Sequence, residues 1–270
     1  MQDFCKNSES EEISMTRIIM NGCNGKMGRV ITDIVSKDPN SVIVAGVDVN
    51  TAQLSDYPVF ARLADVTGIE ADVVIDFSTA SAVDEMLDAC VAGNLPCVLC
   101  TTGLSQDTLE HVKKASEKIA ILKSANMSLG INLLMKLLKD ASPILAQNGF
   151  DIEIVEMHHN QKLDAPSGTA LALADSVNES LNNEYEYVYD RSSRREKRPE
   201  KEIGISAVRG GTITGTHDVI FAGRDEVITF QHMAYSKEIF AKGAVSAAGF
   251  LAGKTNGMYD MSDVIEASSR

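Results

Sequence analysis

Short apolar runs rich in β-branched residues alternate with segments of helical periodicity through the first half of the chain. The runs predict strands over 17–20, 41–47, 71–75, 97–100 and 120–123. The segments between them predict a helix after the first glycine-rich turn and further helices over 81–92 and 105–118. Because strands that alternate with crossover helices run parallel, this half is expected to form a doubly wound α/β sheet.

The pattern changes after residue 126. Helices are predicted over 129–146, 168–181 and 237–252, and strands over 151–157, 203–209, 212–221 and 226–234. The last three strands have no helix between them, so we expect a second, α+β domain built on a mostly antiparallel sheet. The segment 185–202 carries six basic residues among acids and is interpreted as a solvated surface loop.

The length of 270 residues allows two domains, and the charge balance limits their partners. With 38 acidic and 25 basic residues the net charge is −13, which would repel nucleic acid and anionic membranes. No apolar run approaches the ~20 residues that cross a bilayer. Residues 1–14 are polar and acidic, unlike a secretory signal, so we expect a mobile leader, with Met15 as an alternative start, and a cytoplasmic protein.

Five cysteines are too few in a chain of this length to form a disulfide framework. Cys97 and Cys100 form a CxxC motif inside an apolar stretch, and no second pair stands at zinc-ribbon spacing. We therefore interpret both as strand residues rather than as a metal or redox pair.

A glycine-rich turn directly follows the first predicted strand. Gly22, Gly25 and Gly28 would let the backbone turn tightly and approach a pyrophosphate, whose charge is met by the amides that open the following helix. Asp48 ends the second strand about 20 residues later, where a carboxylate binds the ribose hydroxyls of adenosine. This order predicts a Rossmann-type dinucleotide-binding domain. The alternative is an ordinary glycine turn followed by an unrelated strand-end aspartate.

The residues leave the choice between NAD and NADP open. Val49 follows Asp48 where an arginine would pair with a 2′-phosphate, which favours NAD. Lys26 and Arg29 stand close enough in sequence to serve NADP instead. Small polar residues gather at the ends of the third to fifth strands, at the edge where an open α/β sheet binds its ligand: 76–79, 100–103 and 124–126. Turn formation is their alternative role.

Imidazole and ammonium groups cluster after the strand predicted at 151–157. His158, His159 and Lys162 lie close together in sequence in an acidic protein, and such a cluster can attract a dianionic substrate and supply protons near neutral pH. The following DAPSGT segment, 164–169, opens a helix whose free amides can hold a substrate carboxylate.

Other roles compete for these residues. Neighbouring strand residues point to opposite faces, so His158 and His159 can share a pocket only if the strand ends there, and otherwise one is structural. HHxxK has no third ligand at suitable spacing, so no metal is expected. Ser167 lacks the G-x-S-x-G elbow of a serine nucleophile.

With these motifs in place, the chain resembles the 4-hydroxy-tetrahydrodipicolinate reductase family, formerly called dihydrodipicolinate reductase, of bacterial lysine and diaminopimelate biosynthesis. The stretch EMHHNQKLDAPSGTA is the most specific match. The resemblance runs from about Arg17 to the C-terminus and includes GCNGKMGR, VVIDFSTA, TTGLS, SANMSLGIN, ISAVRGGTITGTHDVIFAG and KGAVSAAGFLAGKTNGMYDM.

The resemblance implies reduction of 4-hydroxy-tetrahydrodipicolinate to tetrahydrodipicolinate with NADH or NADPH. It implies that His158 is the catalytic acid/base and Lys162 the proton donor. The substrate carboxylates would be bound by His159, Gly168 and Thr169. The cofactor would be bound by Gly22, Cys23, Asn24, Gly25, Lys26, Met27, Asp48, Cys100, Thr101, Thr102, Ala125, Asn126, Met127 and Ser128.

The resemblance also implies a domain organisation and an assembly. Residues 1–129 would form the dinucleotide-binding domain, 130–239 a substrate-binding and oligomerisation domain, and 240–270 a segment that returns to the first domain. The family is typically a homotetramer that associates through the second domain's sheet. Two positions depart from the family pattern and bear on the cofactor region: Cys100 replaces the usual Gly and Met127 the common Phe.

Two other functions stay open from the residues alone. A different two-domain NAD(P) reductase, of an amino acid or sugar, would share the first domain but would not require PSGTA after HHxxK. A catalytically silent dinucleotide sensor would bind NADH without turning over.

Overall fold

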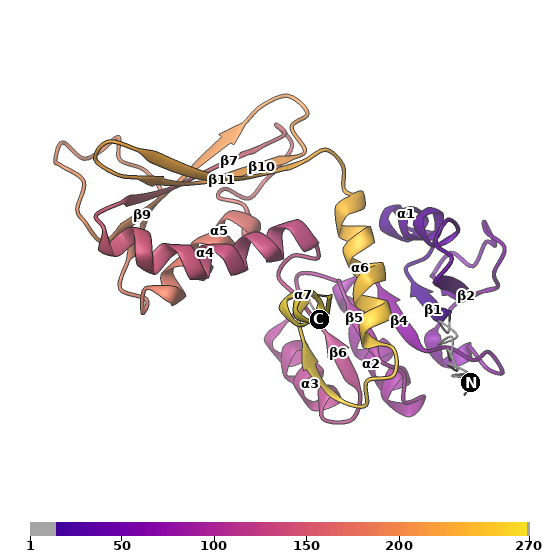
Figure 1. Cartoon of the computed structure of the whole chain (residues 1–270). Helices are drawn as coiled ribbons and strands as arrows, with labels where there is room; N and C mark the ends of the chain where they lie inside the picture. The colour runs from indigo at the N-terminus through magenta and orange to yellow at the C-terminus, as the bar shows by residue number, and fades with distance from the viewer. Residues whose placement is uncertain (1–14, 269–270) are drawn as a thin grey trace, which may run out of the picture.

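The computed structural model describes residues 15–268, which form two sheets (Figure 1). The chain crosses from the first sheet to the second after residue 122 and returns through the helix Glu238–Leu251. The leader predicted over 1–14 lies outside the described residues. No helix within 15–268 combines the length and apolar character needed to span a bilayer.

The first sheet has seven strands in the order β12-β6-β5-β4-β1-β2-β3, and every pairing is parallel. Its strands are β1 Thr16–Asn21, β2 Ser41–Val47, β3 Val59–Phe60, β4 Val73–Asp76, β5 Cys97–Leu99, β6 Ala120–Leu122 and β12 Gly257–Tyr259. Its helices are α1 Lys26–Val35, α2 Val83–Ala92, α3 Gln106–Ser116, α6 Glu238–Leu251 and α7 Met261–Ser268, with short 3-10 turns at Leu63–Asp65 and Ala80–Ala82.

The apolar runs form strands because both faces of this sheet are covered. Ile18 and Met20 of β1 pack in one buried cluster with α1, α6 and α7. Ile19, between them, points the other way into a second cluster with α2 and α3. Helices therefore lie on both faces, and the predicted doubly wound fold is confirmed. The described cysteines, 23, 90, 97 and 100, are free thiols.

The second sheet has five strands in the order β11-β10-β7-β9-β8. The strands are β7 Asp151–His158, β8 Glu186–Val188, β9 Glu202–Arg209, β10 Gly215–Ala222 and β11 Val227–Ala234. Two helices, α4 Leu129–Gln147 and α5 Gly168–Ser180, cover one face, and Figure 1 shows no helix of the described chain on the other.

This sheet is mixed rather than mostly antiparallel. The β10–β7 and β10–β11 pairs are antiparallel, whereas β9 runs parallel to both β7 and β8. The reason is that α5 connects β7 to the far side of the sheet, and a crossover helix returns the chain in the same direction. The predicted α+β class of this region is confirmed.

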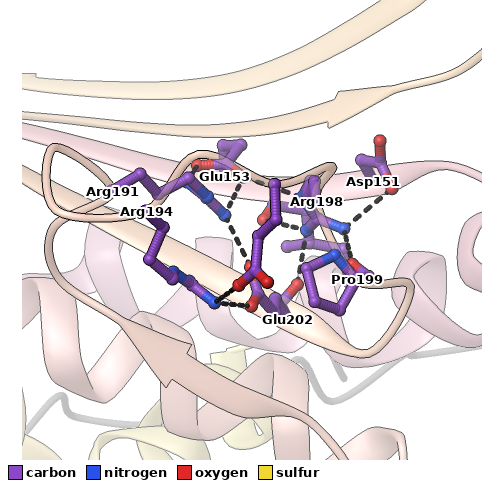
Figure 2. A network of polar contacts seen from close by, with 9 residues as sticks. Asp151, Glu153, Arg191, Arg194, Arg198, Pro199 and Glu202 are labelled. Carbon is purple, nitrogen blue, oxygen red and sulfur yellow. Dashed lines mark hydrogen bonds and ion pairs between the residues drawn. The ribbon is translucent and has the colours of Figure 1, made fainter.

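The basic segment 189–201 folds back onto the sheet instead of extending into water (Figure 2). Arg191 and Arg198 both hydrogen-bond the carboxylate of Glu153 on β7. Arg191 and Arg194 both reach Glu202, which is only 3% exposed. The Glu153 carboxylate lies across Gly204 of β9, where a Cβ would come within 1.9 Å of Oε2. The solvated-loop interpretation is thus wrong for Arg191, Arg194 and Arg198, because carboxylates of the sheet bind them, and of these carboxylates Glu202 is buried.

Candidate active site

A cavity of about 310 Å³ lies between the two sheets and takes residues from both sides. The first sheet contributes Ala125 and Asn126, which follow β6, and Phe240 of α6 also lines it. The second sheet contributes the end of β7, the start of α5 and side chains from β10 and β11. The cavity therefore joins part of the predicted cofactor site to the predicted chemical site.

Both predicted histidines line this cavity. Strand β7 ends at His158, and the chain turns at once, with the Lys162 N–H donating to the His159 carbonyl. His158, 9% exposed, keeps the inward direction of Ile152 and Ile154, while His159 enters the cavity from the turn. The structure thus meets the condition that the sequence left open, namely that the strand ends there.

The His158 ring rests on a buried carboxylate. Its Nδ1 donates to Oε2 of Glu156 at 2.6 Å, and Glu156 is fully buried two residues earlier on the same face of β7. Arg209 donates to both oxygens of Glu156, at 2.8 and 2.7 Å. Burial alone would raise the pKa of Glu156, but the hydrogen bonds from Arg209, His158 and the Ser167 N–H outweigh it and lower that pKa below its ordinary value.

A second buried histidine packs against the first. The His217 ring, from β10, meets His158 edge-on with centroids 5.1 Å apart, and its Nε2 is hydrogen-bonded to the Ser167 hydroxyl at 3.0 Å. Burial, with a smaller electrostatic contribution from His158, lowers the pKa of His217 to about 4. His217 is therefore neutral near pH 7. Burial also lowers the pKa of His232, which lines the cavity from β11.

Lys162 and the start of α5 form the cationic side of the cavity. The Lys162 ammonium pairs with Asp164 Oδ1 at 2.9 Å. This hydrogen bond, helped by the Gly168 backbone, lowers the pKa of Asp164. Ser167 caps α5 by accepting the Ala170 N–H. Gly168 and Thr169 open the helix and line the cavity, where a first-turn backbone favours an anion.

The glycine-rich turn at the end of β1 has the geometry that a bound pyrophosphate needs. Gly22 adopts φ +82°, and a Cβ there would lie 2.5 Å from the Phe77 carbonyl oxygen. A Cβ at Gly28 would lie 2.2 Å from the Gly22 carbonyl oxygen. Gly25 caps α1 without a side chain, so no side-chain acceptor occupies the first-turn amides. The turn therefore fits a phosphate group at the helix start.

Asp48 lies beside this turn, as predicted. Its Oδ2 accepts the Asn24 N–H and its Oδ1 accepts the Asn50 N–H, both at 2.9 Å. The Arg29 guanidinium binds the Asn24 carbonyl at 3.0 Å. Cys23 is buried under the turn, and burial raises the pKa of its thiol to about 11, so it contributes packing rather than a charge.

A second cavity of about 270 Å³ lies at the ends of β5 and β6 and shares Ala125 with the first. Cys100, Thr101 and Thr102 line it, and burial followed by the charge of Asp76 raises the pKa of the Cys100 thiol well above its ordinary value. Three buried oxygens at this edge make no hydrogen bond within the described chain: Asp76 Oδ2, Ser78 Oγ and Thr101 Oγ1. Unpartnered buried oxygens at the ligand edge of a parallel sheet fit a polar cofactor there.

The structure places the 125–128 segment at the junction of the two sheets. The Asn126 amide donates to the Thr169 hydroxyl at 2.9 Å, which links the segment directly to α5. Ser128 is 2% exposed and caps α4, and Met127 is buried against α6, where a Cβ at Gly243 would meet its carbonyl oxygen. Met127 and Ser128 thus line neither cavity, and their side chains serve packing and capping here.

Several residues of the site were not predicted from the sequence. Glu156 carries a readable signal, because it stands two positions before His158 and shares its face on a strand. Arg209, His217, His232 and Lys237 come from β9, β10, β11 and the start of α6, and only the folding of the second sheet brings them to the cavity or its wall.

Comparison with known proteins covers nearly the whole chain. The family models described as Dihydrodipicolinate reductase, N-terminus and C-terminus, match residues 16–127 and 130–265. A 4-hydroxy-tetrahydrodipicolinate reductase of Caldanaerobacter subterraneus subsp. tengcongensis is 52% identical over 93% of this chain and 99% of its own. One of Clostridium tetani is 51% identical over 92% and 96%. A solved dipicolinate-bound dihydrodipicolinate reductase from Paenisporosarcina sp. TG-14 is 26% identical, with TM-score 0.74 over 93% and 99% of the two chains.

Proposed function

The chain belongs to the dihydrodipicolinate reductase family and is an NAD(P)H-dependent oxidoreductase of lysine and diaminopimelate biosynthesis, and we propose how its residues perform the reduction of 4-hydroxy-tetrahydrodipicolinate. The observation that carries the proposal is the cavity in which His158 and Lys162 face residues that follow β6 of the dinucleotide-binding sheet. We also propose that the protein is cytoplasmic and that its domain boundaries lie between residues 129 and 130 and between residues 239 and 240.

The dinucleotide would be held at the carboxyl edge of the first sheet. Its pyrophosphate would lie on Gly22, Gly25 and the first turn of α1, beside Asp48. Its nicotinamide end would extend toward the cavity that Cys100 to Thr102 line, with Ala125 at the boundary with the substrate site. When bound, the cofactor supplies the hydride.

The substrate's two carboxylates match the charges around the first cavity. Lys162 and the α5 backbone at Gly168 and Thr169 would bind one, displacing Asp164 from the ammonium. His159 and Lys237, which also line the cavity, would bind the other. Cationic groups on two sides of the cavity would hold the substrate ring in one orientation. They would also attract the dianionic substrate to a chain whose net charge is −13.

Lys162 and His158 would carry out the proton transfer that the reduction requires. The substrate loses its 4-hydroxyl group as water, which leaves a conjugated imine, and hydride addition converts this to an enamine that needs a proton at the neighbouring carbon. Lys162 would donate that proton, and His158 would polarise or protonate the site. His217, which packs edge-on against His158, would remain neutral and take no part in the proton transfer.

The proposal is tested by NADH oxidation with freshly generated substrate. Wild-type protein should turn over, and Lys162→Ala should lower kcat by ~10²–10⁴-fold, the weight of a positioned acid, with NADH binding retained. Lys37→Ala, which removes a surface lysine paired with Asp33, is the control and should match the wild type. Unchanged turnover in Lys162→Ala would reject the assignment, and NADH binding without any turnover in the wild type would indicate a sensor.

The face of the second sheet that α4 and α5 leave without a helix fits the homotetramer expected from the resemblance. Val208, Val227 and Met233 point away from α4 and α5 and are 44%, 62% and 47% exposed. Exposed apolar side chains on a flat sheet face favour contact between copies of the chain. Val227→Lys with Met233→Lys should lower the mass measured by light scattering, and an unchanged mass would place the contact elsewhere.

A further inference from the structure

We propose that Glu156 is a positioning residue: its one carboxylate holds both the His158 ring and the turn that opens α5, and so sets the geometry between the acid/base and the carboxylate-binding backbone. The proposal rests on the function above. Glu156 itself does not line the cavity, so it would act only through the groups it binds.

Four hydrogen bonds, two to each oxygen, occupy the Glu156 carboxylate. Oε2 accepts from His158 Nδ1 at 2.6 Å and from Arg209 at 2.8 Å. Oε1 accepts from the Ser167 N–H at 3.0 Å and from Arg209 at 2.7 Å. With both oxygens satisfied and no exposed surface, the carboxylate has no freedom to turn away from His158.

The consequence for His158 is a defined tautomer. A carboxylate can only accept, so Nδ1 of His158 must carry a hydrogen, and Nε2 is the nitrogen left to exchange a proton with a substrate. Nε2 lies close to β10, where a Cβ on Gly215 would be only 3.0 Å away. Gly215 therefore gives the reactive nitrogen room that a side chain would remove.

The Glu156 carboxylate also binds the backbone at the start of α5, where a substrate carboxylate would lie. Its bond to the Ser167 N–H holds the N-cap residue of α5, directly before Gly168 and Thr169. Arg209 repeats the connection, because one of its amino groups also binds the Asp164 carbonyl at 2.6 Å. The pair of Glu156 and Arg209 thus fixes the helix start and the imidazole relative to each other.

Glu153 offers a matched control on the same strand. It is also a carboxylate bound by arginines, Arg191 and Arg198, but it lies on the opposite face of β7 in the network of Figure 2. Glu153→Gln removes the same charge from the same strand without touching either histidine or α5. An effect confined to Glu156→Gln therefore cannot come from loss of an arginine–carboxylate pair in general.

The decisive measurement is the tautomer of His158. The protein has five histidines, so ¹⁵N NMR of histidine-labelled protein resolves the ring nitrogens, with His158→Gln assigning its signals. We expect the Nδ1–H form in the wild type and in Glu153→Gln, and a shift toward the Nε2–H form in Glu156→Gln. We also expect kcat to fall ~10–100-fold in Glu156→Gln, as for other residues that orient a functional imidazole, and to stay within about 2-fold in Glu153→Gln.

A second variant covers the case in which Glu156→Gln fails to fold. Arg209→Lys keeps the positive charge beside Glu156 but cannot bind both its oxygens and the Asp164 carbonyl. It should leave the His158 tautomer unchanged and raise KM for the dicarboxylate more than it lowers kcat, because the α5 turn loosens.

Three results would overturn the proposal: an unchanged His158 tautomer in folded Glu156→Gln, an equal loss of kcat in Glu153→Gln, or an unchanged KM in Arg209→Lys. The tautomer is read without turnover. A failure of the proposed reaction, seen as a wild type that does not oxidise NADH, is therefore distinguishable from a failure of this inference.

Discussion

The buried imidazole of His217 should make the stability of the protein depend on pH in a predictable way. Its pKa in the folded protein is about 4, against 6.5 for an ordinary histidine. Between these two values the unfolded chain binds a proton on His217 that the folded protein does not. Acidification therefore favours unfolding, and the stabilisation is complete above about pH 6.5 and lost as the pH falls to about 4.

The magnitude follows from the size of the shift. A difference of about 2.5 pKa units, at 1.36 kcal/mol per unit, corresponds to about 3 kcal/mol. In a His217→Gln variant this contribution is absent, although the lost packing against His158 lowers stability at every pH. The advantage of the wild type over the variant should thus shrink by about 3 kcal/mol between pH 7 and pH 4.

The assay is urea unfolding of both proteins, followed by far-UV circular dichroism at one protein concentration and at several pH values. Carboxylates with lowered pKa values, such as Glu156, also destabilise the fold in acid, but they are present in both proteins and largely cancel in the difference. A difference that stays constant from pH 7 to pH 4, or that grows in acid, would refute the reasoning.

Two further predictions concern the cofactor turn and the substrate site. Gly28→Ala places a Cβ 2.2 Å from a backbone oxygen. It should weaken NADH binding, measured by calorimetry, and lower the free energy of unfolding by about 1–3 kcal/mol. Gly249→Ala is the control, because a Cβ there has open space on α6, and it should change neither quantity. Asp164→Asn removes the carboxylate that pairs with Lys162. The pair is partly exposed and worth at most about 1 kcal/mol, so the variant should tighten the binding of the dicarboxylate substrate, measured as a lower KM, up to ~5-fold. Weaker binding would show that Asp164 supports the site rather than competing for it.

The first sheet was predictable because its information is local. Each strand from β1 to β6, apart from the two-residue β3, is an apolar run buried on both faces, and each intervening helix shows its own periodicity. The glycine turn was predictable for the same reason, since close backbone approach at Gly22 and Gly28 admits no side chain. The three-residue β12 carries no such pattern and becomes a strand only by pairing with β6.

The chemical site was likewise predictable where its residues are close together in the chain, and not where distant strands bring them together. The order HHxxK followed by PSGT placed His158, Lys162 and the start of α5 near one another, because a strand end, a turn and a helix start are neighbours in the chain. The sequence could not place Arg209 on Glu156, 53 residues away, or His217 on Ser167, 50 residues away. Those contacts depend on which strands pair and in which register, and pairing is decided by the burial of the whole second sheet against α4 and α5 rather than by any local pattern.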